Sequence, residues 1–390
     1  MPRPANCCTM MGERGRVCRR CAIKQRLHIR QALATGALLI TILLAACGGS
    51  GGDRRATPIP TRIPPTPTLR STALPEVTEA PAIGAPERPI TVWLALPEDQ
   101  VTSDVGQLGR ELQRQLSDET GLTFTVTFTD ENTALAELCG GAPSLAWTSA
   151  FTYAAARRQC EVEPLLAAKR GRAPTFEIGQ TSEIVGRADI TALAQLAGQT
   201  FCRSTQQDMT AAWVIPALLM GSQGVNPFIE LDAVRDYEDD QALVRALYDG
   251  ECAAAALRAG DFEKALRAVA RTAQTAEEQL PNYDELTEAL HIISPAGDTA
   301  APTDSSQWAG IPAGVIPYEA LVAAPASALP QTLRDSAESV ITAFFTDRID
   351  GATRAKRLLA ADGVFAVEAR HYRSFLAMLS DAGWDMAFTR

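Results

Sequence analysis

The sequence predicts an α/β protein built from mostly parallel sheets that are flanked by helices. From residue 89 onward, short apolar stretches typical of strands alternate with segments whose apolar residues recur at helical spacing. A helix between successive strands is typical of parallel sheets that carry helices on both faces. The chain has 390 residues, so the part beyond the N-terminal leader is long enough for two such lobes.

The first series of elements begins with Ile90–Leu96, a continuous apolar run that predicts a buried strand. Leu108, Leu112 and Leu116 then recur at four-residue spacing, which predicts an amphipathic helix that ends at Gly121. Further strands are expected over 122–129, 144–147 and 162–167. Further helices are expected over 132–138 and 149–158.

The second series repeats this alternation. Strands are expected over 183–186, 200–202, 252–257 and 290–293. Helices are expected over 193–198, 210–220, 241–247, 263–273, 333–345 and 352–359. Pro216 lies inside one of these helical patterns, so that helix is expected to start late or to bend.

Residues 1–46 have the layout of a secretory signal peptide. A basic segment precedes the apolar run Ala32–Leu44, which is too short to span a bilayer as a permanent helix. Leu44-Ala45-Ala46-Cys47 is similar to the bacterial lipobox, in which the cysteine is lipidated and becomes the new N-terminus. We therefore expect an extracytoplasmic protein, lipid-anchored to the cell membrane through Cys47. A plain signal peptide or an N-terminal anchor is the alternative.

Residues 47–88 predict a linker, because they are rich in Gly and Ser and then in Thr and Pro.

The charge of the chain beyond the leader argues against anionic partners. The whole chain has a net charge of −10, and the leader carries eight Lys or Arg and one Glu, so the remainder is near −17. Such an acidic body does not suit nucleic acid or anionic lipid.

Four cysteines remain beyond the lipobox: Cys139, Cys160, Cys202 and Cys252. An even number in an exported protein favours two disulfides. Three connectivities are possible. We favour Cys139–Cys160 and Cys202–Cys252, because each pair falls within one predicted lobe.

The order and spacing of short motifs resemble those of the phosphate/phosphite/phosphonate-binding proteins that serve ABC importers. The resemblance covers residues 89–385. The motifs are Leu96-Pro97-Glu98-Asp99, Leu138-Cys139-Gly140-Gly141, Ala146-Trp147-Thr148-Ser149-Ala150-Phe151-Thr152-Tyr153, Leu196-Ala197-Gly198-Gln199-Thr200-Phe201-Cys202-Arg203, Trp213-Val214-Ile215-Pro216, Tyr248-Asp249-Gly250-Glu251-Cys252, Ile316-Pro317-Tyr318-Glu319 and Leu329-Pro330.

This resemblance implies a two-lobed type II periplasmic-binding fold with a two-stranded hinge. The first lobe would comprise residues 89–186 together with 318–390, and the second lobe residues 187–317. The ligand would lie between the lobes, where helix N-termini meet the ends of parallel strands, a setting that suits an anion. Closure of the hinge would present the loaded protein to a permease.

The chain departs from the family pattern at the expected anion site. Met209-Thr210-Ala211-Ala212 stands where Ser-Thr-Ser-Gly is usual, and Glu238-Asp239-Asp240 where Gly-Ser-His is usual. Gln180 replaces the tyrosine that usually follows the hinge strand. Three carboxylates would repel a phosphonate dianion. The ligand is therefore expected to be phosphonate-like by family, or zwitterionic or cationic by these substitutions.

The expected ligand-binding residues come from both lobes. They are Ser149, Phe151, Tyr153, Gln180, Thr181, Ser182, Thr210, Trp213, Asp239 and Asp240.

Several of these residues have a structural alternative. Asp239 and Asp240 would recognise a cation, or form a solvated cluster at a helix N-terminus. Ser149 would donate to the ligand or merely cap a helix, and Thr181 would donate or end a strand. The aromatic candidates would line the cleft or belong to the core.

Catalysis has little support. Beyond the leader the histidines are His291 and His371, and neither lies near a motif that suggests a triad. No phosphate-cradling Gly-Lys-Ser/Thr loop and no metal-ligand spacing is present, so no cofactor or metal is expected. We expect a monomeric solute-binding lipoprotein of an ABC importer, not an enzyme. The alternative is a ligand-sensing or partner-docking lipoprotein on the same scaffold, and a third, weaker hypothesis is a hydrolase with Asp239 or Asp240 as base.

Overall fold

The computed structural model describes residues 80–96, 103–273, 281–302, 308–346 and 350–384. The leader, Cys47 and the linker up to residue 79 lie outside the described residues, so the predictions for them are not addressed by the fold. Residues 78–390 form one compact unit.

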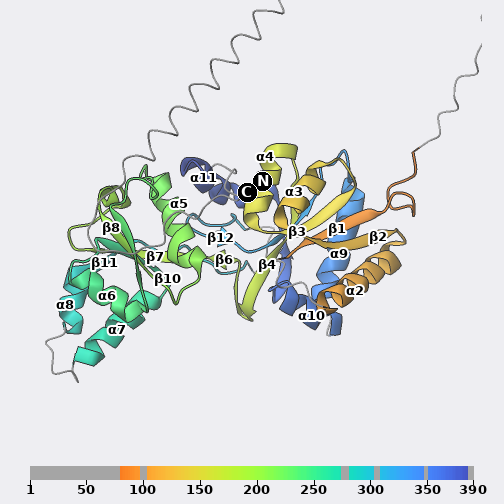
Figure 1. Ribbon diagram of the computed structural model, residues 1–390. Coiled ribbons are helices and arrows are strands. Elements are labelled where there is room, and N and C mark those ends of the chain that lie inside the picture. Colours follow the sequence, from red (N-terminus) through yellow and green to blue (C-terminus); the bar gives the residue numbers. More distant parts are fainter. Residues whose placement is uncertain (1–79, 97–102, 274–280, 303–307, 347–349, 385–390) are drawn as a thin grey trace, which may run out of the picture. The chain divides into compact units, whose positions relative to one another are not determined.

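The larger of two main sheets forms the first lobe (Figure 1). Its described strands run in the order β14-β4-β13-β3-β1-β2, and β5 extends the sheet beside β4. Their bounds are β1 Ile90–Ala95, β2 Phe124–Thr129, β3 Ser144–Thr148, β4 Glu163–Arg172, β5 Thr175–Glu177, β13 Ala320–Ala323 and β14 Gly363–Ala366.

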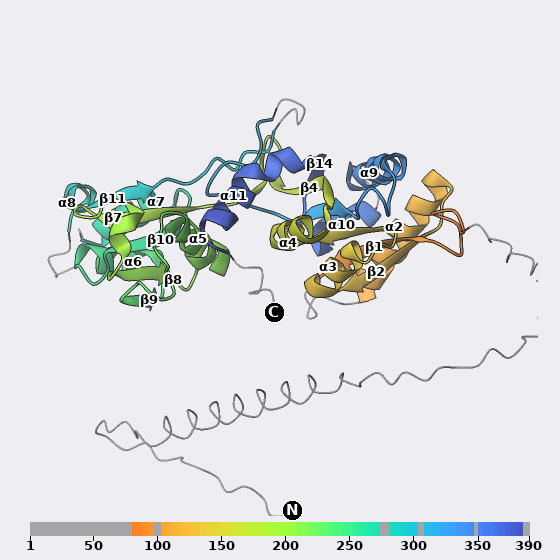
Figure 2. The same ribbon diagram turned by 90° about the horizontal axis from the view of Figure 1, so that it is seen from above.

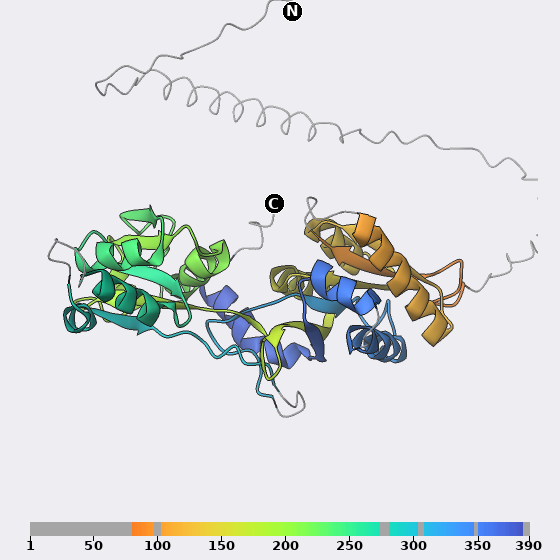
Figure 3. The same ribbon diagram turned by 90° about the horizontal axis from the view of Figure 1, so that it is seen from below.

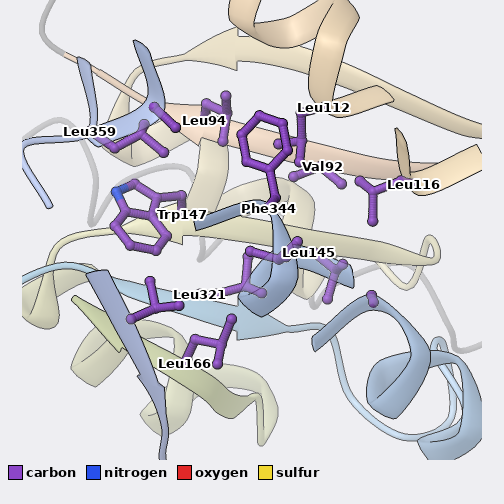
Figure 4. Packing of buried hydrophobic residues seen from close by; sticks show 14 of the residues in the cluster. Val92, Leu94, Leu112, Leu116, Leu145, Trp147, Leu166, Leu321, Phe344 and Leu359 are labelled. Atoms are coloured by element: carbon purple, nitrogen blue, oxygen red, sulfur yellow. The ribbon is translucent and has the colours of Figure 1, made fainter. Parts of the chain in front are cut away.

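Helices cover both faces of this sheet. One face carries α2 (Ser103–Thr120), α9 (Gln331–Thr346) and α10 (Asp350–Leu358) over one apolar cluster. Figure 4 shows Val92, Leu94 and Trp147 of this cluster from the strands, close to side chains from the helices. The other face carries α3 (Glu131–Cys139) and α4 (Ala150–Cys160) over a second cluster.

The second lobe is built on a five-stranded sheet with the order β11-β7-β10-β8-β9, counted within the described ranges. These strands are β7 Ser182–Arg187, β8 Thr200–Ser204, β9 Ala233–Tyr237, β10 Ala254–Arg258 and β11 Leu290–Ser294. The helices are α5 Ile215–Ser222, α6 Asp240–Tyr248, α7 Asp261–Ala273, α8 Tyr283–Ala289 and the short 3₁₀ turn Leu193–Leu196. Apolar clusters place α6, α7 and α8 on one face of the sheet and α5 on the other (Figures 2 and 3).

Both sheets are mixed, which corrects the expectation that each would be mostly parallel. Parallel pairing is confined to β3-β1-β2 in the first lobe and to β10-β8-β9 in the second. The strands β4, β13, β14, β7 and β11 pair antiparallel. The reason is topological. Two parallel neighbouring strands are usually joined by a helix, but β7 and β13 begin directly after the chain has crossed between the lobes, without such a helix before them.

Two short strands form the hinge between the sheets. They are β6 (Gly179–Gln180) and β12 (Ile316–Pro317), which pair antiparallel. The Thr181 hydroxyl donates to Gly314 O at 3.1 Å and accepts from Gly297 N at 2.9 Å. This buried side chain therefore ties the first crossover to the second. The two-stranded hinge agrees with the prediction.

The helix expected over 210–220 is bent at its start. A π-turn over Thr210–Val214 precedes α5, and Ile215 N donates to Thr210 O, five residues earlier. Pro216 lies in the first turn of α5. It has no N–H, and its ring crowds the carbonyl four residues before it, so the chain widens at this point.

The two predicted disulfides are present. Cys139 in α3 is bonded to Cys160 in α4, and Cys202 in β8 is bonded to Cys252, just before β10. The first fastens two neighbouring helices of the first lobe. The second fastens the segment before β10 to its parallel partner β8. Each bond therefore stays within one sheet and its helices.

The C-terminal helix α11 (Arg373–Asp381) packs against α5. Phe375 and Leu379 of α11 share an apolar cluster with Ile215 and Leu218 of α5. A Cβ on Gly221, at the end of α5, would lie 3.1 Å from the Cα of Ala382. The two helices therefore meet at close range, through a glycine.

We predict that Gly179→Ala lowers the free energy of unfolding by about 1–3 kcal/mol, because overpacking a well-packed site costs this much. A Cβ at Gly179 would lie 2.3 Å from Ile316 O and 2.8 Å from Val315 Cγ1, so the two hinge strands would have to separate. Urea denaturation followed by tryptophan fluorescence measures the change.

The matched control is Gly106→Ala in α2, where the nearest atom to a new Cβ is Arg110 Nη1 at 3.6 Å. Removing a glycine from a helix interior should raise the free energy of unfolding by about 0.5–1 kcal/mol. Equal effects of the two substitutions would contradict the tight contact between the hinge strands.

Candidate functional site

A cavity of about 280 Å³ lies beside the hinge, against the second lobe. The end of β5 and the two crossovers contribute Glu177, Gly179, Gln180, Thr181, Thr299 and Tyr318 to its lining. The second lobe contributes Asp208, Ala211, Arg258 and Ala259. The cavity is therefore bounded both by the segments that join the lobes and by one of the lobes, which is where a hinge-bending receptor holds its ligand.

The hinge strands set the position of two predicted ligand residues. Gln180 pairs with Ile316 in the β6–β12 ladder, and Thr181 follows it directly. The Thr181 hydroxyl makes two hydrogen bonds that join the crossovers, one to Gly314 O and one from Gly297 N. Its role beside the cavity is therefore mainly structural. Gln180 is half-buried and lines the cavity.

Glu177 and Tyr318 form one wall of the cavity. The Tyr318 hydroxyl donates to Glu177 Oε2 at 3.5 Å. Burial, and next the Glu177 carboxylate, raise the pKa of Tyr318 to about 12, so this hydroxyl is a protonated donor at neutral pH. The Arg170 guanidinium lies 4.0 Å from the centre of the Tyr318 ring and is paired with Glu319 at 2.8 Å. The tyrosine is thus fixed by stacking and by its place beside β12.

Asp208 and Arg258 form the opposite wall. Asp208 Oδ1 accepts from Ala211 N at 3.1 Å, so this carboxylate caps the π-turn that leads into α5. Asp208 Oδ2 lies 3.3 Å from Arg258 Nη2, at the end of β10. Thr210, one of the expected ligand-binding residues, is half-buried and does not line this cavity, whereas its neighbour Ala211 does.

The N-terminus of α4 is satisfied from within the first lobe. The Ser149 hydroxyl accepts from Thr152 N at 3.3 Å, as an N-cap does. Ser149 N donates to Glu131 Oε1 at 3.0 Å, and the buried Thr148 hydroxyl donates to the other oxygen of the same carboxylate. The cap alternative for Ser149 is therefore realised, and its ligand contact stays a prediction.

The acidic residues at α6 also have structural partners. Asp239 is the N-cap of α6 and accepts from Ala242 N at 2.8 Å. Asp240 accepts from Gln207 Nε2 at 2.9 Å. Neither lines the cavity beside the hinge. The alternative of a helix N-terminal cluster describes this arrangement, and recognition of a cation by these two residues stays a prediction.

The remaining predicted residues lie mostly in packed surroundings. Tyr153 is fully buried, and its ring lies 4.7 Å from that of Tyr372, so it belongs to the core. Phe151 packs against Phe375 of α11 at 5.6 Å. Ser182 is fully buried at the start of β7. The ring of Trp213, half-buried, packs between aromatic residues of the second lobe, Phe201 at 6.1 Å and Phe228 at 5.9 Å.

Sequence reasoning missed four charged or aromatic residues of the cavity: Glu177, Asp208, Arg258 and Tyr318. A signal was present for Tyr318, which stands in the motif Ile316-Pro317-Tyr318-Glu319 that carried the family resemblance. Arg258 also ends an apolar strand pattern, at the edge where ligands of α/β sheets lie. Asp208 and Glu177 give no such signal, because their contacts with Arg258 and Tyr318 join residues far apart in the sequence.

Two further observations concern metals and membranes. Within the described ranges, no three His, Cys, Asp or Glu side chains gather closely enough to hold a metal ion. Among the helices of that same part, none combines the length and the apolar character required to cross a bilayer.

Comparison with solved structures finds matches of low sequence identity. XAC2383 from Xanthomonas citri, bound to chloride ion, is 13% identical, with a TM-score of 0.42, and the match covers 77% of this chain and 99% of that one. A binding protein component of an ABC phosphonate transporter from Pseudomonas aeruginosa is 13% identical, with a TM-score of 0.37 and coverage of 75% and 87%. PhnD1 from Prochlorococcus marinus, in complex with methylphosphonate, is 13% identical, with a TM-score of 0.37 and coverage of 75% and 98%.

No curated protein matches the chain. The comparison with protein families matches residues 96–305, more than half of the chain, to the family described as "ABC transporter, phosphonate, periplasmic substrate-binding protein". The matched range contains the whole second sheet, β6 of the hinge and most of the cavity lining. The chain belongs to the family of periplasmic substrate-binding proteins of phosphonate ABC transporters.

Proposed function

We propose that this protein captures a small solute in the cavity beside the hinge and delivers it to an ABC permease. The observation that carries the proposal is the origin of the cavity lining. Gln180 and Tyr318 come from the two crossovers, whereas Asp208 and Arg258 come from the second lobe. A solute that touches both groups favours the conformation in which they are close, and this differential affinity shifts the conformational population.

The family description favours transport over the alternatives. A ligand-sensing or partner-docking protein on the same scaffold has no comparable support, because the matched family consists of transporter components. A hydrolase with Asp239 or Asp240 as base is also not favoured, since each of these carboxylates accepts a hydrogen bond that stabilises the fold around α6. Binding without chemistry is therefore the function we assign to the cavity.

The lipid anchor belongs to this proposal. A receptor has to stay near its permease, and acylation at Cys47 would keep it at the membrane. Two or more acyl chains hold a protein stably, since each buried methylene contributes about 0.8 kcal/mol. The Thr/Pro-rich linker that follows would act as a stalk between membrane and folded part. We expect the receptor to act as a monomer.

The first test is a thermal-shift screen of methylphosphonate, phosphite and phosphate, followed by amines and amino acids. A solute at 100 times its Kd should stabilise the protein by about 2.7 kcal/mol. We predict that Ala259→Trp, which places a large side chain at the exposed edge of the cavity, weakens binding of any such solute by roughly tenfold or more through steric exclusion.

Ala194→Trp, on the exposed side of the 3₁₀ turn Leu193–Leu196 in the same lobe, serves as the control and should leave binding unchanged. A solute that stabilises the Ala259→Trp variant as strongly as the wild type would place the binding site elsewhere. If no solute of the panel stabilises the wild type, the partner-docking alternative is favoured.

For the anchor, we predict that Cys47→Ser releases the protein from membranes into the soluble fraction, because the serine hydroxyl cannot take the place of the acylated thiol. Fractionation followed by immunoblotting measures the distribution. Cys139→Ser is a matched control, since it removes a cysteine from the folded part without touching the lipobox. Retention of the Cys47→Ser variant in the membrane would indicate an uncleaved N-terminal anchor.

A further inference from the structure

Tyr318 lies where the second crossover enters the first lobe, directly after β12 and two residues before β13. Its N–H donates to Ile178 O of the first crossover at 3.0 Å. The carbonyl of the next residue, Glu319, accepts from Ala168 N of β4 at 2.8 Å. The backbone is therefore held on both sides of the tyrosine, and the point from which its side chain extends is fixed.

The ring of Tyr318 is held by Arg170 of β4. The guanidinium carbon of Arg170 lies 4.0 Å from the centre of the ring. Its Nη2 donates to both carboxylate oxygens of Glu319, each at 2.8 Å. A planar guanidinium that is paired in this way stacks on an aromatic face and has little freedom to rotate away from it. Arg170 therefore fixes the direction of the tyrosine without lining the cavity itself.

The hydroxyl of Tyr318, by contrast, is weakly bound. Within the described part of the chain its one hydrogen bond goes to Glu177 Oε2 at 3.5 Å, whereas hydroxyl donors usually lie about 2.7–2.8 Å from their acceptors. Glu177 is exposed, so its carboxylate is free to turn to water when another acceptor approaches the hydroxyl. Burial is the main reason why the pKa of Tyr318 is raised to about 12, and the hydroxyl therefore keeps its proton at neutral pH.

Two other donors of the lining already have closer partners. The Thr181 hydroxyl makes two hydrogen bonds between the crossovers. Arg258 Nη2, on the opposite wall, lies 3.3 Å from Asp208 Oδ2. Tyr318 differs from both, because its backbone and ring are rigidly placed while its hydroxyl has only a distant and exposed acceptor. An acceptor oxygen of a solute in the cavity would be a better partner for this hydroxyl than Glu177.

We propose that Tyr318 is a ligand-binding residue, whose hydroxyl donates to an oxyanionic group of the solute, and that Arg170 is a positioning residue that acts through the Tyr318 ring. The solute class is one that offers a phosphonate, phosphite or carboxylate oxygen as the acceptor. Tyr318 lies outside residues 96–305, the range that matches the family, so the family match does not assign it. The assignment rests on the proposed function, because it concerns the solute held in the same cavity.

The role of the hydroxyl is tested by isothermal titration calorimetry of the intact chain with methylphosphonate, at a pH where this probe carries one negative charge. Tyr318→Phe keeps the ring on Arg170 and removes only the hydroxyl. It should weaken methylphosphonate binding by roughly tenfold or more, as expected when a hydrogen bond to a charged group is lost. Tyr237→Phe is the matched control and should leave binding unchanged, because it removes a hydroxyl that donates to Glu251 at 2.7 Å, away from the cavity.

The role of Arg170 is tested by a double-mutant cycle with the same probe. Arg170→Lys keeps the positive charge but loses the planar face, so it should weaken methylphosphonate binding by roughly threefold or more. In the Tyr318→Phe background the same substitution should cost nothing further, because no hydroxyl is left to position. Equal losses in both backgrounds would show a general structural effect and overturn the positioning role. Arg172→Lys, at an exposed position further along β4, is the control and should not alter binding.

The assignment of Tyr318 is overturned if the wild type does not bind methylphosphonate. It is also overturned if the Tyr318→Phe variant, verified as folded by circular dichroism, binds methylphosphonate as tightly as the wild type. Failure of the proposed function would look different, because Ala259→Trp would then not weaken binding of any solute from the screening panel. A solute that is excluded by Ala259→Trp but binds equally well to the wild type and to Tyr318→Phe would retain the cavity and overturn only the role of the hydroxyl.

Discussion

The structure depends on the contact between two short crossover strands at Gly179. A Cβ at this position would fall 2.3 Å from Ile316 O, so the two backbones approach as closely as they do only because one residue has no side chain. On its other side the first crossover is hydrogen-bonded to an earlier part of the second crossover, with Ile178 N donating to Thr299 O at 2.9 Å. These contacts bring Gln180, Thr181 and Tyr318 to one wall of the cavity. A wider separation would leave these side chains on independent loops.

Electrostatics at the strand ends is the second constraint. Helices that begin beside one another at the edge of a sheet direct several positive dipole ends to the same region. The chain balances this charge with its own carboxylates: Asp130 at α3, Glu131 at α4, Asp208 before α5 and Asp239 at α6. Hydrogen bonds from the backbone and hydroxyl of Thr133 hold the pKa of Asp130 below its usual value, so it stays ionised. The acidic residues at these helix starts thus offset the positive ends of the helix dipoles.

The sequence predicted the helices and strands that have a strong apolar pattern. It did not predict those that form only against partners elsewhere in the chain. The apolar run at β1 and the four-residue repeat of α2 were predicted within a few residues. The four-residue strand β13 was not, because such a short segment carries no periodicity, and the two-stranded hinge was expected only from the family resemblance. β9 was missed because its side chains are half-buried or exposed, so it lacks the apolar alternation of a covered strand.

The same distinction applies to the site. Gln180 and Thr181 were found through their place after the hinge strand, a local feature of the chain. The contact between Glu131 and Ser149 joins residues 18 apart, and the pair Asp208–Arg258 joins residues 50 apart. Each partner alone has an ordinary explanation as a helix-start or strand-end residue. Only the folded arrangement shows that the Glu131 carboxylate accepts a hydrogen bond from Ser149 N, at the start of the next helix.

The contact between α5 and α11 limits how the hinge can work. α11 follows the last strand of the first sheet, yet its apolar face shares a cluster with α5, which covers the second sheet. Gly221 faces Ala382 with no room for a larger side chain, so the two helices cannot slide past each other without separating. Interiors packed in this way favour a few discrete arrangements over continuous deformation. Bending at β6 and β12 therefore has two possible outcomes for α11. Either α11 moves together with the second lobe, or the contact between α11 and α5 repacks in one step. In the second case the receptor would have two distinct states.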